Sequence, residues 1–316
     1  MSEIFKNIPE IKYEGADSTN PFAFKFYDAE KVILGKKMKE QLLADFVRPF
    51  DLGTAPLMRL KVVSVGEEDN LLLFDMHHII SDGMSANILI EEFIKLYNGE
   101  TLEPLRVQYK DYSEWMRTRD ISAQKAYWVE QFSEEAPVLD MPLDYSRPQY
   151  QSFKGSNVRT TIDKAVVAQV EAFAKETGTT EYMVLLSALM VTLSKYSRQE
   201  DIVIGTPISG RTHRDTESMI GMFVNTLAMR GRPEGKKTFA EFLAEMKEVC
   251  LKAYENQEYP FEELVEAVEV KRDLSRNPLF DVMFSLQNNE QAKGEIEGVN
   301  KTSLVETDDT VAKFDL

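Results

Sequence analysis

Two short segments, residues 71–76 and 202–208, are apolar at most of their positions. Such runs predict strands that are buried on both faces, because a strand with one face in solvent alternates apolar and polar side chains. Residues 57–65 do alternate, and a polar turn at residues 66–70 follows them. The two apolar segments are therefore predicted to be central strands.

Helices are predicted between these strands. The helix expected at residues 164–175 ends at Gly178, and the helix at residues 180–196 is so apolar that we expect it to be buried. Other helices are expected at residues 85–97, 109–117, 123–132, 239–254 and 261–268, and further strands at residues 158–162, 223–229 and 280–286. Strands and helices that alternate in this way predict an α/β sandwich, with the connector at residues 137–155 as the boundary between two lobes.

The charge and the cysteine content exclude several classes of function. The chain has 316 residues and a formal net charge of -16, which disfavours both nucleic acid and an anionic membrane surface as partners. It has no apolar run long enough to span a bilayer, and residues 1–12 contain no signal-peptide core, which favours the cytoplasm. Cys250 is the single cysteine, so an internal disulfide is excluded and a buried thiol is expected.

Reactive side chains are concentrated at the end of the apolar strand 71–76, where two of the three histidines are adjacent. Neighbouring residues of a strand point to opposite faces, so only one of His77 and His78 can enter a given cleft. Asp82 can fix the following loop, and Gly83 permits a tight turn before the next helix. An imidazole at such a place is suited to moving a proton at cellular pH.

A purely structural role explains the same spacing. A buried histidine pair at a strand end, with Asp82 capping the next helix, accounts for it at least as well as catalysis does. A metal site is a weaker interpretation, because adjacent histidines lack the spacing that places two ligands on one helix face and no third ligand is evident. The spacing alone leaves both roles open for His78.

Residues 77–83, with the sequence HHIISDG, match the HHxxxDG signature of the condensation domains of nonribosomal peptide synthetases. A wider form of that signature also occurs in CoA-dependent acyltransferases. Further stretches resemble condensation-domain motifs in the same order, namely residues 46–52 (FVRPFDL), 107–115 (VQYKDYSEW), 127–128 (YW), 204–211 (IGTPISGR), 220–227 (IGMFVNTL), 259–265 (YPFEELV) and 272–280 (RDLSRNPLF). From about residue 42 onward the chain is similar to this family.

The resemblance implies two chloramphenicol-acetyltransferase-like lobes that form a V-shaped pseudodimer with a channel between them. Two carrier proteins would present substrates on their phosphopantetheine arms, and the chain itself would bind no cofactor and no metal. An aminoacyl or peptidyl thioester would be attacked by the amine of an aminoacyl thioester to form an amide. The expected partners are therefore peptidyl carrier proteins.

The resemblance also implies roles for individual residues. His78 corresponds to the catalytic histidine of the family, acting as a general base or positioning the amine. His77 and Asp82 correspond to structural residues, and Gly83 to a residue whose backbone lies near the developing oxyanion. Asn225 corresponds to the channel asparagine of the second lobe, for which strand-end hydrogen bonding is the structural alternative.

Two polar residues between the motifs of the second half are also candidates. Arg211 is expected at the channel, either as an ion-pair partner or, as its loop position favours, as a solvated side chain. His213 is expected at the surface.

The chain differs from the family pattern at both ends. Residues 42–150 correspond to the remainder of the N-terminal lobe and residues 151–316 to part of the C-terminal lobe, so both lobes are expected to be incomplete. Exposed sheet edges would then favour oligomers. Residues 1–41 resemble the N-terminus of bacterial xylose isomerases but contain none of that family's metal ligands. A fusion junction near residues 38–43 is the resulting hypothesis.

Three functions follow from these observations. The first is amide-bond formation between carrier-bound substrates. The second is a truncated, inactive module that still docks carrier proteins. The third is a related acyltransferase that uses CoA or a soluble acceptor.

Overall fold

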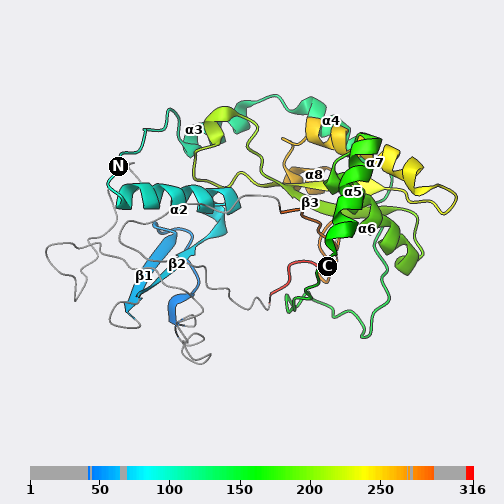
Figure 1. Cartoon of the computed structure of the whole chain (residues 1–316), viewed down its shortest axis with the longest axis horizontal. Coiled ribbons are helices and arrows are strands. Elements are labelled where there is room, and N and C mark those ends of the chain that lie inside the picture. Colours follow the sequence, from blue (N-terminus) through cyan, green and yellow to red (C-terminus); the bar gives the residue numbers. More distant parts are fainter. Residues whose placement is uncertain (1–41, 43–44, 65–69, 269, 271–272, 288–310) are drawn as a thin grey trace. The chain divides into compact units, whose positions relative to one another are not determined.

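The computed structural model describes residues 42, 45–64, 70–268, 270, 273–287 and 311–316 (Figure 1). The described residues fall into two compact units. The first consists of the residues up to Arg117 together with Arg211–Phe223, and the second of Thr118–Gly210, residues 224–287 and residues 311–316. The chain thus leaves the second unit after Gly210 and returns to it at Val224. The segment 1–41, expected to be foreign, lies outside the described residues.

The first unit contains a two-stranded ribbon followed by helices (Figure 1). Strands β1 (Met58–Ser64) and β2 (Asn70–Met76) are antiparallel, and Arg59 of β1 is paired with Asp75 of β2. The short 3-10 helix η2 (His78–Ile80) follows β2, and α2 (Gly83–Tyr97) and α3 (Tyr109–Thr118) come next. A second 3-10 helix, η3 (Arg214–Thr216), lies in the segment contributed by the second half of the chain.

The second unit contains strands β3 (Ile202–Ile208) and β4 (Asn225–Gly231), which are antiparallel. Its helices are α4 (Ser122–Gln131), α5 (Lys164–Thr177), α6 (Glu181–Ser197), α7 (Phe239–Glu255) and α8 (Phe261–Ala267). Helix α6 packs on β3, α7 packs on β4, and the two helices also pack on each other. The sheet is thus covered by helices, as the apolar sequence of β3 requires.

Apolar side chains from these four elements form the core of the second unit. Leu186 and Met190 of α6, Ile204 of β3, Met229 of β4 and Met246 of α7 are completely buried. Helix α6 is apolar around most of its circumference, and this pattern is typical of a helix enclosed by other elements. The expectation that it is buried is confirmed.

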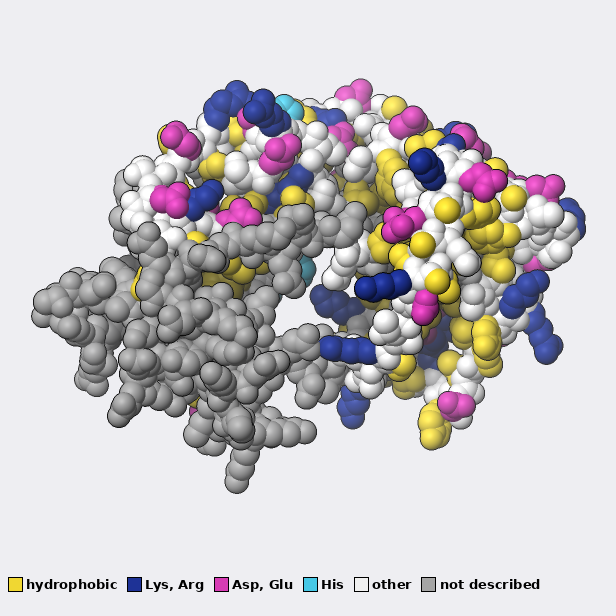
Figure 2. All heavy atoms as spheres, in the orientation of Figure 1, with side chains coloured by type: hydrophobic (Ala, Val, Ile, Leu, Met, Phe, Trp, Pro, Cys, Tyr) yellow, Lys and Arg dark blue, Asp and Glu magenta, His cyan; other side chains and the backbone are white. Residues whose placement is uncertain are grey.

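Acidic and basic side chains are interspersed over the face of the second unit that Figure 2 shows. The ion pairs of this unit include Arg232 with Glu134 at 2.6 Å and Lys237 with Glu245 at 2.8 Å. Such exposed pairs contribute about 0–1 kcal/mol each to stability. On the face shown, the helices of this unit do not form a basic surface.

The predicted helices and four of the predicted strands are confirmed, with bounds that agree to within about two residues. The expectation that the strand at residues 71–76 is central and buried on both faces is wrong, because among the described residues β2 pairs with β1 alone and Phe74 is 40% exposed. The predicted strand at residues 158–162 is wrong. Among the described residues no partner strand pairs with this segment, and Val158 is 96% exposed. The β-branched residues of this segment favour an extended backbone, but a strand also needs a neighbour that satisfies its hydrogen bonds.

The predicted strand at residues 280–286 is also wrong as a regular strand. Only an isolated parallel bridge forms, between Gly205 of β3 and Met283. Gly205 donates to the Val282 carbonyl at 2.9 Å and accepts from the Phe284 N–H at 2.8 Å. A Cβ at Gly205 would lie 2.2 Å from the ring of Phe280, so only glycine permits this close approach.

The connector at residues 137–155 lies within the second unit, and the compact units divide the chain elsewhere. The expected lobe boundary at this connector and the domain limits at residues 41, 150 and 316 therefore stay predictions.

The core can be tested with a buried and an exposed substitution. We expect Leu186→Ala to lower the free energy of unfolding by about 2–5 kcal/mol, because it leaves a cavity among helices and strands. Val158→Ala should change it by less than about 0.5 kcal/mol, since that side chain lies in solvent. Urea unfolding of both variants checks this, and similar losses from the two would contradict the assignment of the core.

Candidate active site

His77 holds the turn that follows β2. Its backbone N–H donates to the Leu57 carbonyl at 3.0 Å, which extends the pairing of β1 and β2 beyond Met76. Its Nδ1 accepts from the Ile79 N–H at 3.0 Å and so caps η2. The ring of His77 also meets the ring of Phe50 edge-on, with centroids 5.9 Å apart. The side chain of His77 is therefore engaged by contacts within the first unit.

His78 is the exposed member of the pair. Its Nδ1 lies 2.6 Å from the carbonyl oxygen of Ser81. Because a carbonyl oxygen can only accept, this contact assigns the proton to Nδ1 and leaves the lone pair of the neutral ring on Nε2. The turn η2 thus presents an imidazole that can take up a proton at Nε2.

Asp82 is 4% exposed and organises the loop between η2 and α2. Its Oδ1 accepts from the backbone N–H of Ser85 at 2.7 Å, which caps α2, and its Oδ2 accepts from the N–H of Phe223 at 3.1 Å. Arg211 Nη2 lies 3.1 Å from Oδ1. Burial alone would raise the pKa of the Asp82 carboxyl, but hydrogen bonds from Ser85 and Phe223 and the charge of Arg211 together lower it.

Arg211 is buried, with only 2% of its side chain exposed. Its guanidinium also donates to the carbonyl oxygens of Thr216 and Met219 and lies over the ring of Phe223, 4.0 Å from the centroid. The preference for a solvated side chain is therefore wrong, and the ion-pair alternative is confirmed. The loop position suggested solvent, but residues 211–223 fold onto the first unit and take Arg211 with them.

The segment 211–223 is held by residues that the sequence analysis did not single out as part of the site. The Ser85 hydroxyl is fully buried, accepts from the Gly221 N–H at 3.0 Å and lies 2.8 Å from the Gly221 carbonyl oxygen. A Cβ at Gly221 would lie 2.1 Å from the ring of Tyr109, whose hydroxyl donates to the Met222 carbonyl at 2.6 Å. All of them belong to or adjoin recognised motifs, so a signal for them existed.

Gly83 is the first residue of α2 and is exposed. A Cβ added there would meet nothing within 4 Å, and its φ lies outside the left-handed region that favours glycine. Neither packing nor backbone conformation among the described residues therefore requires glycine at this position. The first N–H groups of a helix have no partner within the helix, so open space at this end allows an acceptor to approach them.

Asn225 lies in the second unit, at the start of β4. Its Nδ2 donates to the carbonyl oxygens of Gln257 and Tyr259, each at 2.8 Å. Its Oδ1 accepts from the N–H groups of Phe261 at 3.1 Å and Thr226 at 2.8 Å. An amide side chain offers two donors and two acceptor positions, so all are used by backbone groups. These contacts are the strand-end hydrogen bonds that were the structural alternative for Asn225, and its position at a channel stays a prediction.

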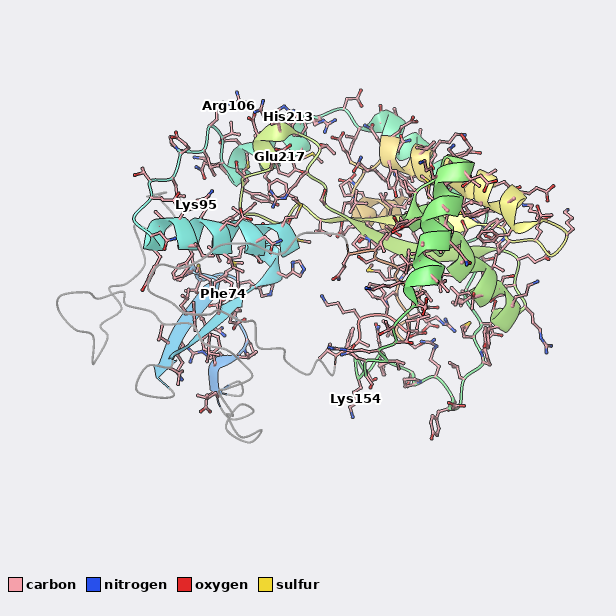
Figure 3. All side chains as sticks on the ribbon, viewed as in Figure 1. Phe74, Lys95, Arg106, Lys154, His213 and Glu217 are labelled. Atoms are coloured by element: carbon pink, nitrogen blue, oxygen red, sulfur yellow. The ribbon has the colours of Figure 1, made fainter. Side chains whose placement is uncertain are left out.

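The other candidate groups lie outside this arrangement. Cys250 is buried, as expected, and burial raises the pKa of its thiol to about 12, so it is a poor nucleophile. His213 is exposed (labelled in Figure 3), and its Nδ1 accepts from the N–H of Asp215, whose carboxylate pairs with Arg106. In the part of the chain that is described, no group of three or more His, Cys, Asp and Glu side chains is arranged to hold a metal ion, and no helix is both long and apolar enough to cross a membrane.

Residues 14–316 match the family profile described as the condensation domain. The match includes residues 14–41, although the resemblance to this family was expected to begin only at about residue 42. The chain is 52% identical over 281 residues to bacitracin synthase 3 of Bacillus licheniformis, covering 88% of this chain and 4% of that protein. It is also 52% identical over 260 residues to gramicidin S synthase 2 of Brevibacillus brevis, covering 81% of this chain and 6% of that protein. The chain thus spans a small part of these curated relatives.

Solved structures are similar as well. A four-domain nonribosomal peptide synthetase, solved in its holo form with AMP and glycine bound, superposes with a TM-score of 0.74 at 26% identity, covering 85% of this chain and 21% of that chain. The X-domain from teicoplanin biosynthesis superposes with a TM-score of 0.77 at 24% identity, covering 88% and 66%. These likenesses confirm the expected α/β fold of the chloramphenicol-acetyltransferase type. The incompleteness of the lobes stays a prediction.

The charge of Asp82 can be tested by pH. We expect Asp82→Asn to lower the free energy of unfolding at pH 7 by about 3–5 kcal/mol, because Arg211 is left buried without its counter-charge. Folding lowers the pKa of Asp82, so the charged form stabilises the folded state above the ordinary pKa of about 3.9. That contribution is lost as the pH falls through the lower folded-state pKa.

Urea unfolding of both proteins between pH 7 and pH 3 measures the difference. The advantage of the wild type should be constant from about pH 7 to 5 and shrink at more acid pH. A difference that stays the same down to the lowest pH at which both proteins fold would contradict the assignment of the charge.

Proposed function

The chain belongs to the condensation-domain family, and from this premise we propose that it joins two carrier-bound substrates through an amide bond. The donor is an aminoacyl or peptidyl thioester, and the acceptor is the amine of an aminoacyl thioester. Both arrive on the phosphopantetheine arms of peptidyl carrier proteins, and the chain itself holds no cofactor. The observation that carries the proposal is His78, an exposed imidazole whose Nδ1 is anchored on Ser81 and whose Nε2 keeps its lone pair.

Amide formation requires a proton to leave the attacking amine. The amine nitrogen bonds to the thioester carbonyl carbon, and the carbon–sulfur bond breaks to release the thiol of the donor arm. Nε2 of His78 takes the proton from the nitrogen and can return it to the leaving sulfur, so no other acid or base is needed. Positioning of the amine by the same atom is the second part of this role.

Negative charge develops on the carbonyl oxygen as the amine attacks. The open N-terminus of α2 at Gly83 offers backbone N–H groups and the positive end of the helix dipole to this oxygen. The Asp82 carboxylate accepts the N–H of Ser85 in this turn and also binds Phe223 and Arg211, so the N–H groups proposed to meet the oxygen are those that precede Ser85.

The remaining candidates act on the backbone rather than on substrate. His77 caps the turn η2, and Asp82 with Arg211 fixes the loop before α2. Asn225 fixes the backbone before α8 in the second unit. The channel role expected for Arg211 and Asn225 is thus a positioning role, in which each holds the backbone of its own unit.

Further predictions about the chain concern its ends and its state. The proposed fusion near residues 38–43, natural or constructed, competes with the condensation-domain match, which includes residues 14–41. The sequence of the native gene decides, because an unbroken condensation-domain N-terminus there would mean that the segment resembling xylose isomerases was joined artificially. The chain acts in the cytoplasm, and exposed edges of its sheets favour oligomers, which light scattering after size-exclusion chromatography would measure.

The catalytic role of His78 is tested with two loaded carrier proteins. We expect His78→Ala to reduce the formation of dipeptidyl thioester by roughly 10²–10⁴-fold, because the proton acceptor is lost. His213→Ala is the matched control, since that histidine is exposed and lies outside the candidate site. This variant should form as much product as the wild type. Mass spectrometry of the carrier proteins measures the product.

Each other outcome has a definite meaning. Full activity of His78→Ala would overturn the catalytic assignment. A well-folded wild type that binds the carriers without forming product would favour the inactive docking module. Product from acyl-CoA and a soluble acceptor, but not from carriers, would favour the related acyltransferase.

A substitution at Gly83 is expected to affect activity without lowering stability. We expect Gly83→Ala to keep or raise the melting temperature, because the added Cβ meets open space and alanine favours the helix by up to about 1 kcal/mol. Product formation should nevertheless fall, since the methyl group occupies the approach to the first turn of α2. Gly221→Ala is the contrasting variant, because its added Cβ would clash with the Tyr109 ring and lower stability as well. Unchanged activity of Gly83→Ala would contradict the proposal that the carbonyl oxygen binds at the N-terminus of α2.

A further inference from the structure

Arg59 of β1 gathers three elements of the first unit. Its Nη1 donates to the Arg48 carbonyl at 2.6 Å and to Asp75 Oδ2 at 2.9 Å, and its Nη2 donates to the Pro49 carbonyl at 2.9 Å. The plane of its guanidinium also covers the ring of Phe50, with Cζ 3.6 Å from the centroid. The side chain is 16% exposed, so these contacts are made mostly out of water.

Phe50 links Arg59 to the histidine pair, because its ring contacts both Arg59 and His77. One face of its ring lies under Arg59, and the ring meets the His77 ring edge-on at 5.9 Å, with an interplanar angle of 90°. Asp75 and His77 are two residues apart on the same chain, and side chains at this spacing share one face of a strand. Asp75, Arg59 and Phe50 therefore form a continuous support behind His77.

His77 in turn determines the shape of η2. Its Nδ1 accepts from the Ile79 N–H in this turn, and its carbonyl accepts from the Ile80 N–H at 3.1 Å. The turn closes when the Ser81 N–H donates to the His78 carbonyl at 3.3 Å, and the Ser81 carbonyl meets His78 Nδ1. A shift of the His77 ring would therefore move the carbonyl that selects the tautomer of His78.

From these contacts we infer that Arg59, acting through Phe50 and His77, is a positioning residue that holds the turn presenting His78 in its proton-accepting tautomer. The catalytic consequence rests on the proposed function, whereas the consequence for the tautomer does not. Arg59 touches neither His78 nor the reacting atoms, so its effect is exerted through the shape of η2.

Only arginine suits this position. A planar guanidinium can donate to two carbonyls and a carboxylate in its plane while its face covers an aromatic ring. Lysine keeps the charge, but its ammonium group cannot stack and donate in this way. Arg59→Lys is therefore a variant that retains the ion pair with Asp75 and loses the support of Phe50.

The chain's histidine content makes the test direct, because only His77, His78 and His213 give imidazole signals. Nitrogen-15 NMR of the full chain labelled at histidine distinguishes the tautomers. In the wild type His78 should carry its proton on Nδ1, whereas His77 and His213 accept at Nδ1 and should carry theirs on Nε2.

In Arg59→Lys and Phe50→Leu we expect the His78 signals to move from the Nδ1-protonated form to a mixture of tautomers, while the His213 signals stay unchanged. Arg117→Lys is the matched control, because Arg117 is 74% exposed and its ion pair within the described part of the chain is with Glu114 of its own helix. It should leave all three histidines as in the wild type. Unchanged His213 signals also show that a variant is folded.

Kinetics completes the test. In the carrier-protein assay both variants should lower kcat roughly tenfold to a hundredfold, as a misplaced catalytic group does, and leave KM within about twofold. Unchanged His78 signals in both folded variants would overturn the inference. If Arg59→Lys fails to fold, Phe50→Leu decides. A wild type without turnover would count against the proposed function alone, because the NMR result stands without it.

Discussion

Two opposite charges, Asp82 and Arg211, are almost completely removed from water in the first unit, with 1% and 2% of their side chains exposed. Taking an ion out of water costs several kcal/mol, and a close partner with further hydrogen bonds offsets this cost. Here the carboxylate also caps α2 and accepts from Phe223, and the guanidinium also binds two carbonyls. Burial of the pair depends on these hydrogen bonds, and together they fix the conformation of the loop that precedes α2.

Local sequence patterns predicted most of the fold and the centre of the candidate site. Strands such as residues 202–208 and helices such as residues 180–196 follow from their own apolar periodicity, which needs no knowledge of distant residues. The motif at residues 77–83 likewise placed His78 and Asp82 at a strand end before a helix. The tautomer of His78 was beyond reach, because it depends on where one backbone carbonyl, that of Ser81, points.

The failures all concern partners that are distant in the sequence. Arg211 looked like a loop residue in solvent because nothing near it shows that its segment folds onto the first unit. Residues 158–162 and 280–286 have the composition of strands, yet a strand exists only where another segment pairs with it. Gly221 and Ser85 were missed as site residues for the same reason, since their contact joins positions 136 apart.

The excursion of residues 211–223 from the second unit into the first also constrains how the protein is made. A ribosome releases Asp82 long before Arg211, which follows 129 positions later. Until then the carboxylate has no counter-charge to bury and stays hydrated, so the first unit cannot be finished by its own N-terminal residues. Much of the second unit emerges in between. The nascent chain must therefore keep the site of Asp82 open and complete its first unit only after most of its second has been synthesised.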